Sequence, residues 1–125
     1  MKNIVKRSFL DSLRFPVRHK IALRDYLVAL DSIAEEAGIT DIWLFGSCAR
    51  EEATAWSDVD LLVLVKGKLP EDMSRAKFVI YNGTYMLAED PEVQLTVRFT
   101  DTFWNGTDFF TRSVKKDALQ VAKYE

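Results

Sequence analysis

The stretch LFGSCAREEATAWSDVDLLVLV, residues 44–65, decides the fold. It joins a glycine-serine pair to an apolar run that begins with two aspartates one residue apart, Asp58 and Asp60. The run predicts a buried strand, and carboxylates are costly to bury without a compensating positive charge. Side chains two apart on a strand share a face, which places the two Cα atoms about 6–7 Å apart. Their repulsion favours a cation between them, and Mg²⁺, which takes oxygen ligands and keeps positions open for substrate phosphates, is the candidate.

The glycine-serine pair, Gly46 and Ser47, ends a shorter apolar run, DIWLF, which predicts another strand. Ten residues separate Ser47 from Asp58, too few for a parallel crossover with a helix, so the sequence predicts antiparallel neighbours. Antiparallel pairing of the two strands brings Gly46 and Ser47 opposite Asp58. Glycine lets the backbone approach a phosphate, serine adds a hydroxyl, and a helix beginning just after them offers free amides. Arg50, one turn further on, either reaches the same phosphates or pairs with a neighbouring glutamate.

Helices and strands alternate on both sides of this stretch. Apolar residues at three- and four-residue spacing predict a helix over about 20–37, ended by Gly38. Proline followed by acids predicts a helix from Pro70 to the mid 80s, and the alternation in EVQLTVRF predicts a strand over 92–99. With a closing helix over about 107–119, the fold class is α/β (α+β), with a small, mixed, largely antiparallel sheet flanked by helices.

Composition bounds the class of protein. At 125 residues, 48% hydrophobic and 29% charged, the chain fits one ordinary globular domain. It has no 18-residue apolar span, no signal core and a single cysteine, so a cytoplasmic location is predicted. Residues 1–20 carry six Lys/Arg against one acid although the net charge is −2. Residues 1–18 are therefore interpreted as a basic arm, either a contact surface for phosphates, nucleic acid or an acidic partner, or a solvated face. Weak helical periodicity over 4–13 stops before Pro16.

Three further side chains have alternative interpretations. Trp56 either stacks on a base or serves in packing or a partner contact. Cys48 either has a thiol pKa lowered by a helix start or fills a small space in the core. His19, the only histidine, is interpreted as a surface residue.

Taken together, GSCAREEATAWSDVD resembles the signature of the polymerase-beta-like nucleotidyltransferases, which is Gly-Ser, ten residues, then Asp-x-Asp. Element order extends the resemblance over about residues 20–125, and the chain is similar to the minimal nucleotidyltransferases (MNT). The resemblance implies a nucleotidyltransferase domain over 19–125. The site residues that it implies are Gly46 and Ser47 for the triphosphate of ATP, and Asp58 and Asp60 for two Mg²⁺ ions.

The sequence departs from the family at the third carboxylate, which helps to bind metal and activates the attacking hydroxyl. Gln94 stands there, and glutamine is a poor base and a poor Mg²⁺ ligand. Either Glu92, two residues earlier, substitutes as the catalytic carboxylate, or the protein binds nucleotide and transfers it slowly or not at all.

The resemblance implies transfer of AMP from ATP to a hydroxyl of a helical HEPN-type protein partner, with this chain as the antitoxin. One alternative is a catalytically degenerate nucleotide-binding module that neutralises its partner by contact. Another is a small-molecule nucleotidyltransferase of the aminoglycoside type, for which the chain is short unless a homo-oligomer builds the acceptor pocket. Neither a membrane nor a nucleic acid is predicted as a partner.

Overall fold

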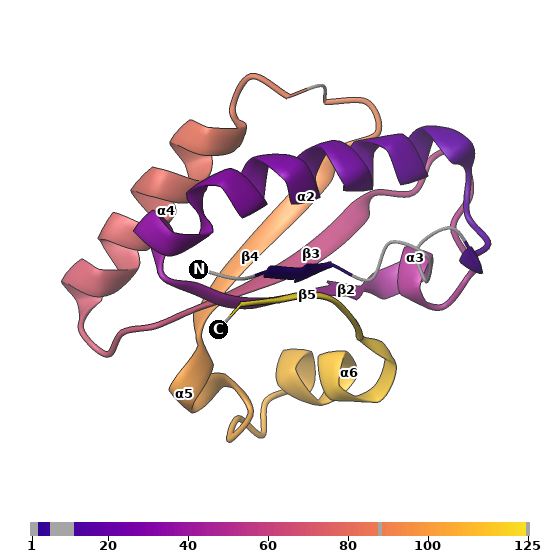
Figure 1. Ribbon diagram of the computed structural model, residues 1–125. Coiled ribbons are helices and arrows are strands. Elements are labelled where there is room, and N and C mark those ends of the chain that lie inside the picture. The colour runs from indigo at the N-terminus through magenta and orange to yellow at the C-terminus, as the bar shows by residue number, and fades with distance from the viewer. Residues whose placement is uncertain (1–2, 6–11, 88, 125) are drawn as a thin grey trace.

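Five strands form one mixed sheet in the order β1-β5-β2-β3-β4, with helices against both faces (Figure 1). The computed structural model describes residues 3–5, 12–87 and 89–124. In chain order the elements are β1 Asn3–Val5, α2 Val17–Ala37, β2 Ile39–Phe45, α3 Gly46–Ala49, β3 Val59–Val65, α4 Pro70–Thr84, β4 Val93–Phe99, α5 Thr100–Phe103, α6 Phe109–Asp117 and β5 Leu119–Tyr124.

The sheet is largely antiparallel, as the sequence predicted. β2 pairs antiparallel with both β3 and β5, and β1 pairs antiparallel with β5. β3 and β4 are parallel, and α4 makes the crossover between them. The register pairs Phe45 at the end of β2 with Asp60 near the start of β3. The predicted meeting of the glycine-serine turn with the acids is therefore confirmed at the level of the backbone.

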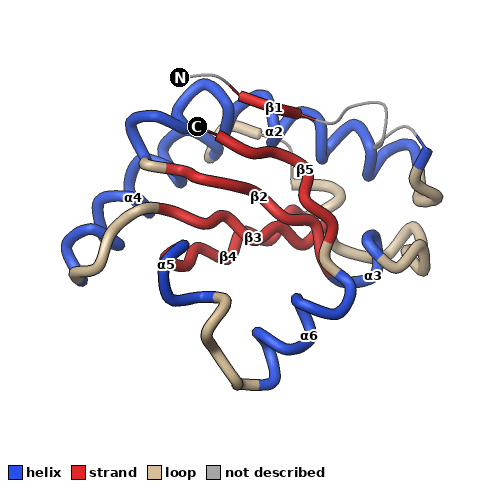
Figure 2. Tube along the Cα trace, turned by 60° about the horizontal axis from the view of Figure 1, so that its bottom comes forward, coloured by secondary structure: helices blue, strands red, loops and turns tan. Residues whose placement is uncertain are grey.

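Two layers of helix cover the sheet. Figure 2 shows α2 and α4 on one side of the strands and α5 and α6 on the other. Leu61 and Val63 of β3 pack under α2 and α4, whereas Leu62 and Leu64 pack with Phe103 of α5 on the opposite face. α2 ends because Gly38 takes the left-handed conformation, with φ 74°, as its sequence position predicted. Burial of β3 on both faces explains its unbroken apolar run.

The predicted closing helix is correct only in part. α6 ends at Asp117, and Leu119–Tyr124 forms β5, an inner strand between β1 and β2. Ala118 leaves the helical conformation with ψ 144°. The prediction missed this strand because its apolar residues, Leu119, Val121, Ala122 and Tyr124, do not alternate cleanly with polar ones.

The N-terminal segment also differs from its prediction. Asn3–Val5 is a strand rather than the start of a helix, because its backbone pairs with β5. The rest of the weakly helical pattern falls mainly on residues 6–11, which lie outside the described residues. Leu13 and Phe15 belong to the hydrophobic core, and α2 begins at Val17. The boundary between an arm and a domain after residue 18 stays a prediction.

Within residues 3–5, 12–87 and 89–124, no helix has both the length and the apolar character that a bilayer span requires.

Candidate functional site

The two aspartates lie on the face of the sheet that α5 and α6 cover. Leu62 and Leu64 point to that face, and the two-residue period of β3 places Asp60 on the same side. Gln94, which pairs with Asp60, also hydrogen-bonds the carboxylate of Asp58, so the two acids lie close together. Burial raises the pKa of Asp60 above its ordinary value, and the charge of Asp58 raises it further, while Arg50 opposes the shift. The pair therefore carries negative charge that Arg50 offsets only in part, and a cation would stabilise it.

Gly46 lies directly against this charge. Its φ is 76°, a backbone conformation that residues with a Cβ rarely adopt. A Cβ built at Gly46 would collide with the carboxylate of Asp60. A side chain at this position would be strained by the backbone conformation and would require the carboxylate of Asp60 to move. The backbone turn approaches Asp60 rather than Asp58, which the sequence had placed opposite it.

Ser47 and Arg50 lie in and just after α3. The helix, Gly46–Ala49, is a single turn, and it begins at Gly46 itself rather than just after Ser47. The Nε of Arg50 lies 2.8 Å from an Oε1 of Glu52 in an exposed ion pair, as the alternative interpretation of Arg50 held. Such a pair contributes little free energy, so it leaves the guanidinium available to an anion. The charge of Arg50 already acts on Asp60.

Gln94 contacts the acids where a third carboxylate was expected. The parallel register pairs Gln94 with Asp60, and its Nε2 donates a 2.9 Å hydrogen bond to Oδ2 of Asp58. Glu92 lies at the same end of β4, where its carbonyl accepts a 2.9 Å bond from the amide of Val59. Glu92 and Asp58 line one cavity of about 150 Å³. A catalytic role for Glu92 stays a prediction.

The donor set fits a magnesium ion that arrives with a substrate. Among the described residues, no three His, Cys, Asp or Glu side chains gather into a group that could hold a metal ion. Mg²⁺ is usually bound by one or two carboxylates, with water and substrate phosphates completing the shell. Asp58 and Asp60 supply two carboxylates beside a turn that a phosphate can approach.

His19 was missed as a functional candidate. The sequence interpretation placed it on the surface, but it is fully buried, with Nε2 2.7 Å from the carbonyl oxygen of Ser57. The signal was present in the helical period, because His19, Leu23, Tyr26 and Leu30 continue one buried stripe. The preceding residue, Arg18, donates from Nη2 to the carbonyl of Ala55 at 2.8 Å.

Cys48 and Trp56 have opposite environments. Cys48 is fully buried, and burial together with the charges of Asp60 and Asp58 raises the pKa of its thiol to about 11. It is the small core residue of the second interpretation, not an activated thiol. Trp56 is 94% exposed in the segment that leads to Asp58, so it is available to a ligand or partner.

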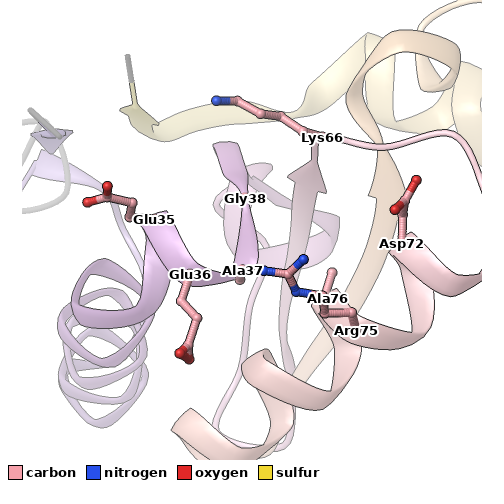
Figure 3. A pocket seen from close by; sticks show the side chains of 8 residues that line it. All are labelled: Glu35, Glu36, Ala37, Gly38, Lys66, Asp72, Arg75 and Ala76. Carbon is pink, nitrogen blue, oxygen red and sulfur yellow. The ribbon is translucent and has the colours of Figure 1, made fainter.

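A second cavity, of about 210 Å³, lies at the opposite end of the β2–β3 pair (Figure 3). Lys66 and Arg75 line it together with the acids Glu36 and Asp72. Because these charges are of mixed sign, the cavity offers no positive surface to a polyphosphate. The candidate site is therefore the end that carries Asp58 and Asp60.

Comparison with known proteins agrees with this geometry. The sequence model of the family described as nucleotidyltransferase domain matches residues 27–119. The fold is similar to the crystal structure of a candidate nucleotidyltransferase from Sulfolobus solfataricus, at 18% identity and a TM-score of 0.50, covering 85% of this chain and 87% of that one. A candidate minimal nucleotidyltransferase is similar at 25% identity and a TM-score of 0.48, covering 79% of this chain and 92% of that one. No curated protein sequence matches the chain.

Proposed function

The chain belongs to the nucleotidyltransferase domain family, and from that premise we propose that it transfers AMP from ATP, with Mg²⁺, to a hydroxyl of a protein partner. The observation that carries the proposal is the position of Gly46 against Asp60, on the face that Asp58 shares. Carboxylates for a metal ion and an approachable turn for phosphates meet there.

Each residue has a distinct task in this proposal. Asp58 and Asp60 would hold Mg²⁺, which neutralises phosphate charge and polarises the reacting phosphoryl group. Gly46 allows the triphosphate to approach the backbone, with Ser47 and Arg50 as donors to it. The acceptor oxygen attacks the α-phosphorus, the bond to the bridging oxygen breaks, and pyrophosphate leaves.

The proton of the acceptor hydroxyl needs a base. Gln94 has no ionisable group and cannot serve. Glu92 is the proposed base because it lines the same cavity as Asp58. Its longer side chain would have to reach the acceptor from the start of β4.

An exposed aromatic side chain beside the site favours a protein partner, whereas cavity size does not select between acceptors. A cavity of about 380 Å³, which Glu92 lines with Tyr26, is within the usual range of about 300–1,000 Å³ for small-molecule pockets. The cavity beside Asp58 is smaller, about 150 Å³. Trp56, 94% exposed, lines that cavity, and exposed aromatic side chains often mark partner surfaces. A helical HEPN-type partner, for which this chain is the antitoxin, and a cytoplasmic location complete the proposal.

A second candidate is neutralisation of the partner by contact alone. The bond from Gln94 to Asp58 favours it, since an amide occupies the place of the third carboxylate. If the protein acts by contact alone, it binds the nucleotide without transferring AMP efficiently, and its surface neutralises the partner by binding it.

Labelled ATP, Mg²⁺ and the candidate partner distinguish the two. Wild-type protein should label the partner, and Asp58→Asn should abolish labelling while Asp101→Asn, an exposed carboxylate on α5, should not. Trp56→Ala should weaken partner binding but not ATP binding. If Asp58→Asn labels the partner as fast as wild type, the enzymatic proposal is wrong. If it labels nothing yet neutralises the partner in cells, contact is sufficient.

A further inference from the structure

Asp58 and Asp60 are supported in different ways. Asp60 lies inside the sheet, where it pairs with Phe45 of β2 and Gln94 of β4. Asp58 precedes the first residue of β3, so the strand ladders do not include it. Gln94 of β4 holds the carboxylate of Asp58, but the position of the Asp58 backbone depends on contacts from outside the strand ladders.

His19 supplies a buried contact of this kind. A carbonyl oxygen only accepts hydrogen bonds, so the 2.7 Å contact to Ser57 requires a proton on Nε2. The other nitrogen, Nδ1, is buried and has no hydrogen-bond partner among the described residues. A proton on Nδ1 would leave a buried donor unpaired, so the arrangement favours the tautomer with its proton on Nε2.

The bond to Ser57 acts on Asp58 through the backbone. A peptide group is planar, so the direction of the Ser57 carbonyl also sets the direction of the Asp58 amide. On the other side, the Asp58 carbonyl lies 3.6 Å from Sγ of Cys48, and the amide of Val59 donates a 2.9 Å hydrogen bond to the backbone carbonyl of Glu92. The backbone of Asp58 is thus tied before and after the residue.

Arg18 adds a second attachment between α2 and the same segment. Its Nη2 donates to the carbonyl of Ala55 at 2.8 Å, and its Nη1 lies 3.3 Å from Oδ2 of Asp90. These contacts are exposed and contribute less than a buried one. His19 is therefore the contact whose loss should matter.

We propose that His19 is a positioning residue for nucleotidyl transfer: its Nε2–H holds the Ser57 carbonyl and so keeps Asp58 in place beside Asp60. This inference rests on the role of Asp58 in the proposed function. His19 itself does not touch the nucleotide or the reacting atoms.

The first experiment needs no nucleotide. His19 is the only histidine, so the imidazole signals of a tag-free protein in long-range ¹H–¹⁵N NMR spectra at pH 8 are unambiguous. The expected pattern is a proton on Nε2 and none on Nδ1, with the backbone signals of Ser57 and Asp58 shifted in His19→Leu. A proton on Nδ1, or a ring averaging both forms, overturns the proposal even if the protein binds no ATP.

The second experiment measures ATP binding by calorimetry as a function of Mg²⁺ concentration. His19→Leu removes the donor, whereas the amide of His19→Gln can still donate from a similar distance. We expect His19→Leu to weaken Mg²⁺-dependent binding about tenfold, as loss of supporting contacts around metal ligands does, and His19→Gln to restore most of it.

A matched control separates positioning from stability. Ile80 is fully buried on α4, so Ile80→Val should lower the thermal midpoint without affecting Mg²⁺-dependent binding. If Ile80→Val weakens binding as much as His19→Leu, or if Gln and Leu at position 19 are equally impaired, His19 is only a structural residue. If wild type binds no ATP, the proposed function fails, and the NMR result alone decides the role of His19.

Discussion

Gln94 and Asp58 are joined by a hydrogen bond of 2.9 Å from the amide Nε2 to the carboxylate Oδ2. An amide donor at this place stabilises the cluster where a third acid would repel Asp58 and Asp60. The same amide can neither accept the proton of an acceptor hydroxyl nor ligate Mg²⁺ well. Gln94 therefore stabilises the metal-free site but lowers the expected rate of nucleotidyl transfer.

Gln94→Asp should raise the rate of nucleotidyl transfer in the presence of Mg²⁺. The new carboxylate adds a base and a ligand, and general bases contribute about 10²–10⁴-fold to rates. Without Mg²⁺ the variant should melt at a lower temperature than wild type, because three acids then crowd one face. Steady-state rates and thermal unfolding with and without Mg²⁺ check both effects. Gln94→Asn, which stays neutral, should not be faster, and a Gln94→Asp protein no faster than wild type would contradict the prediction.

Asp60→Asn should stabilise the metal-free protein at neutral pH. Folding raises the pKa of Asp60 above its ordinary value of 3.8, so the protonated carboxyl is favoured in the folded chain. The contribution of this group to stability is fully present below pH 3.8 and is lost as the pH rises through the folded pKa. The variant stays neutral, so its advantage over wild type should be absent at pH 3 and full at pH 7. Chemical denaturation at the two pH values measures the difference. An advantage of equal size at both would show that the charge is not its cause.

Gly46→Ala should abolish ATP binding and destabilise the fold more than Gly38→Ala. Both glycines have a positive φ, 76° and 74°, which costs a Cβ-bearing residue about 1–2 kcal/mol. In the control, Gly38→Ala, the new Cβ makes only ordinary van der Waals contact, with Lys66 Cβ at 3.8 Å, whereas the Cβ at Gly46 meets Asp60. Denaturation curves and ATP titrations compare the pair. Equal behaviour of the two variants would mean that Asp60 moves aside freely.

Glu51→Gly should increase the free energy of unfolding by about 0.5–1 kcal/mol. Glu51 has φ 60°, a left-handed conformation that glycine adopts without the steric cost of a Cβ. Glu51→Ala removes the charge but keeps the Cβ, so it should leave the stability close to that of wild type. Urea denaturation of the three proteins measures the effect. A stabilised alanine variant would point to charge rather than backbone strain.

Cys48 should resist alkylation by iodoacetamide at pH 7.5 until the protein unfolds. Its side chain is fully buried, and its thiol pKa of about 11 leaves little thiolate. Mass spectrometry after timed labelling in 0 M and 8 M urea follows the reaction. Rapid labelling of the folded protein would show that the turn after β2 opens often.

The sequence predicted the part of the fold in which local pattern and tertiary role agree. β3 is continuously apolar because it is buried on both faces, α4 starts at a proline, and Gly38 ends α2. β5 escaped prediction because an inner strand at the end of a helix has neither clear alternation nor a turn residue before it. β1 depends on pairing with β5, which no local pattern in the sequence reveals.

The site divides in the same way. The spacing in residues 44–65 was sufficient to predict that Gly46 meets the paired acids, because strand period and loop length fix that geometry. It was not sufficient to choose Asp60 over Asp58 as the nearer acid, which depends on register. The contact of His19 with Ser57 joins residues 38 positions apart, so only the folded chain brings them together.

The pairing of β1 with β5 has a consequence for the order in which the molecule folds. Asn3 pairs with Tyr124, a contact 121 positions apart along the chain (124 − 3) that raises the contact order and forms late. β1 is the outermost strand, separated from β3 by β5 and β2. This edge can therefore open and close again while β3 stays protected from hydrogen exchange, so its opening leaves the strand that carries Asp60 undisturbed.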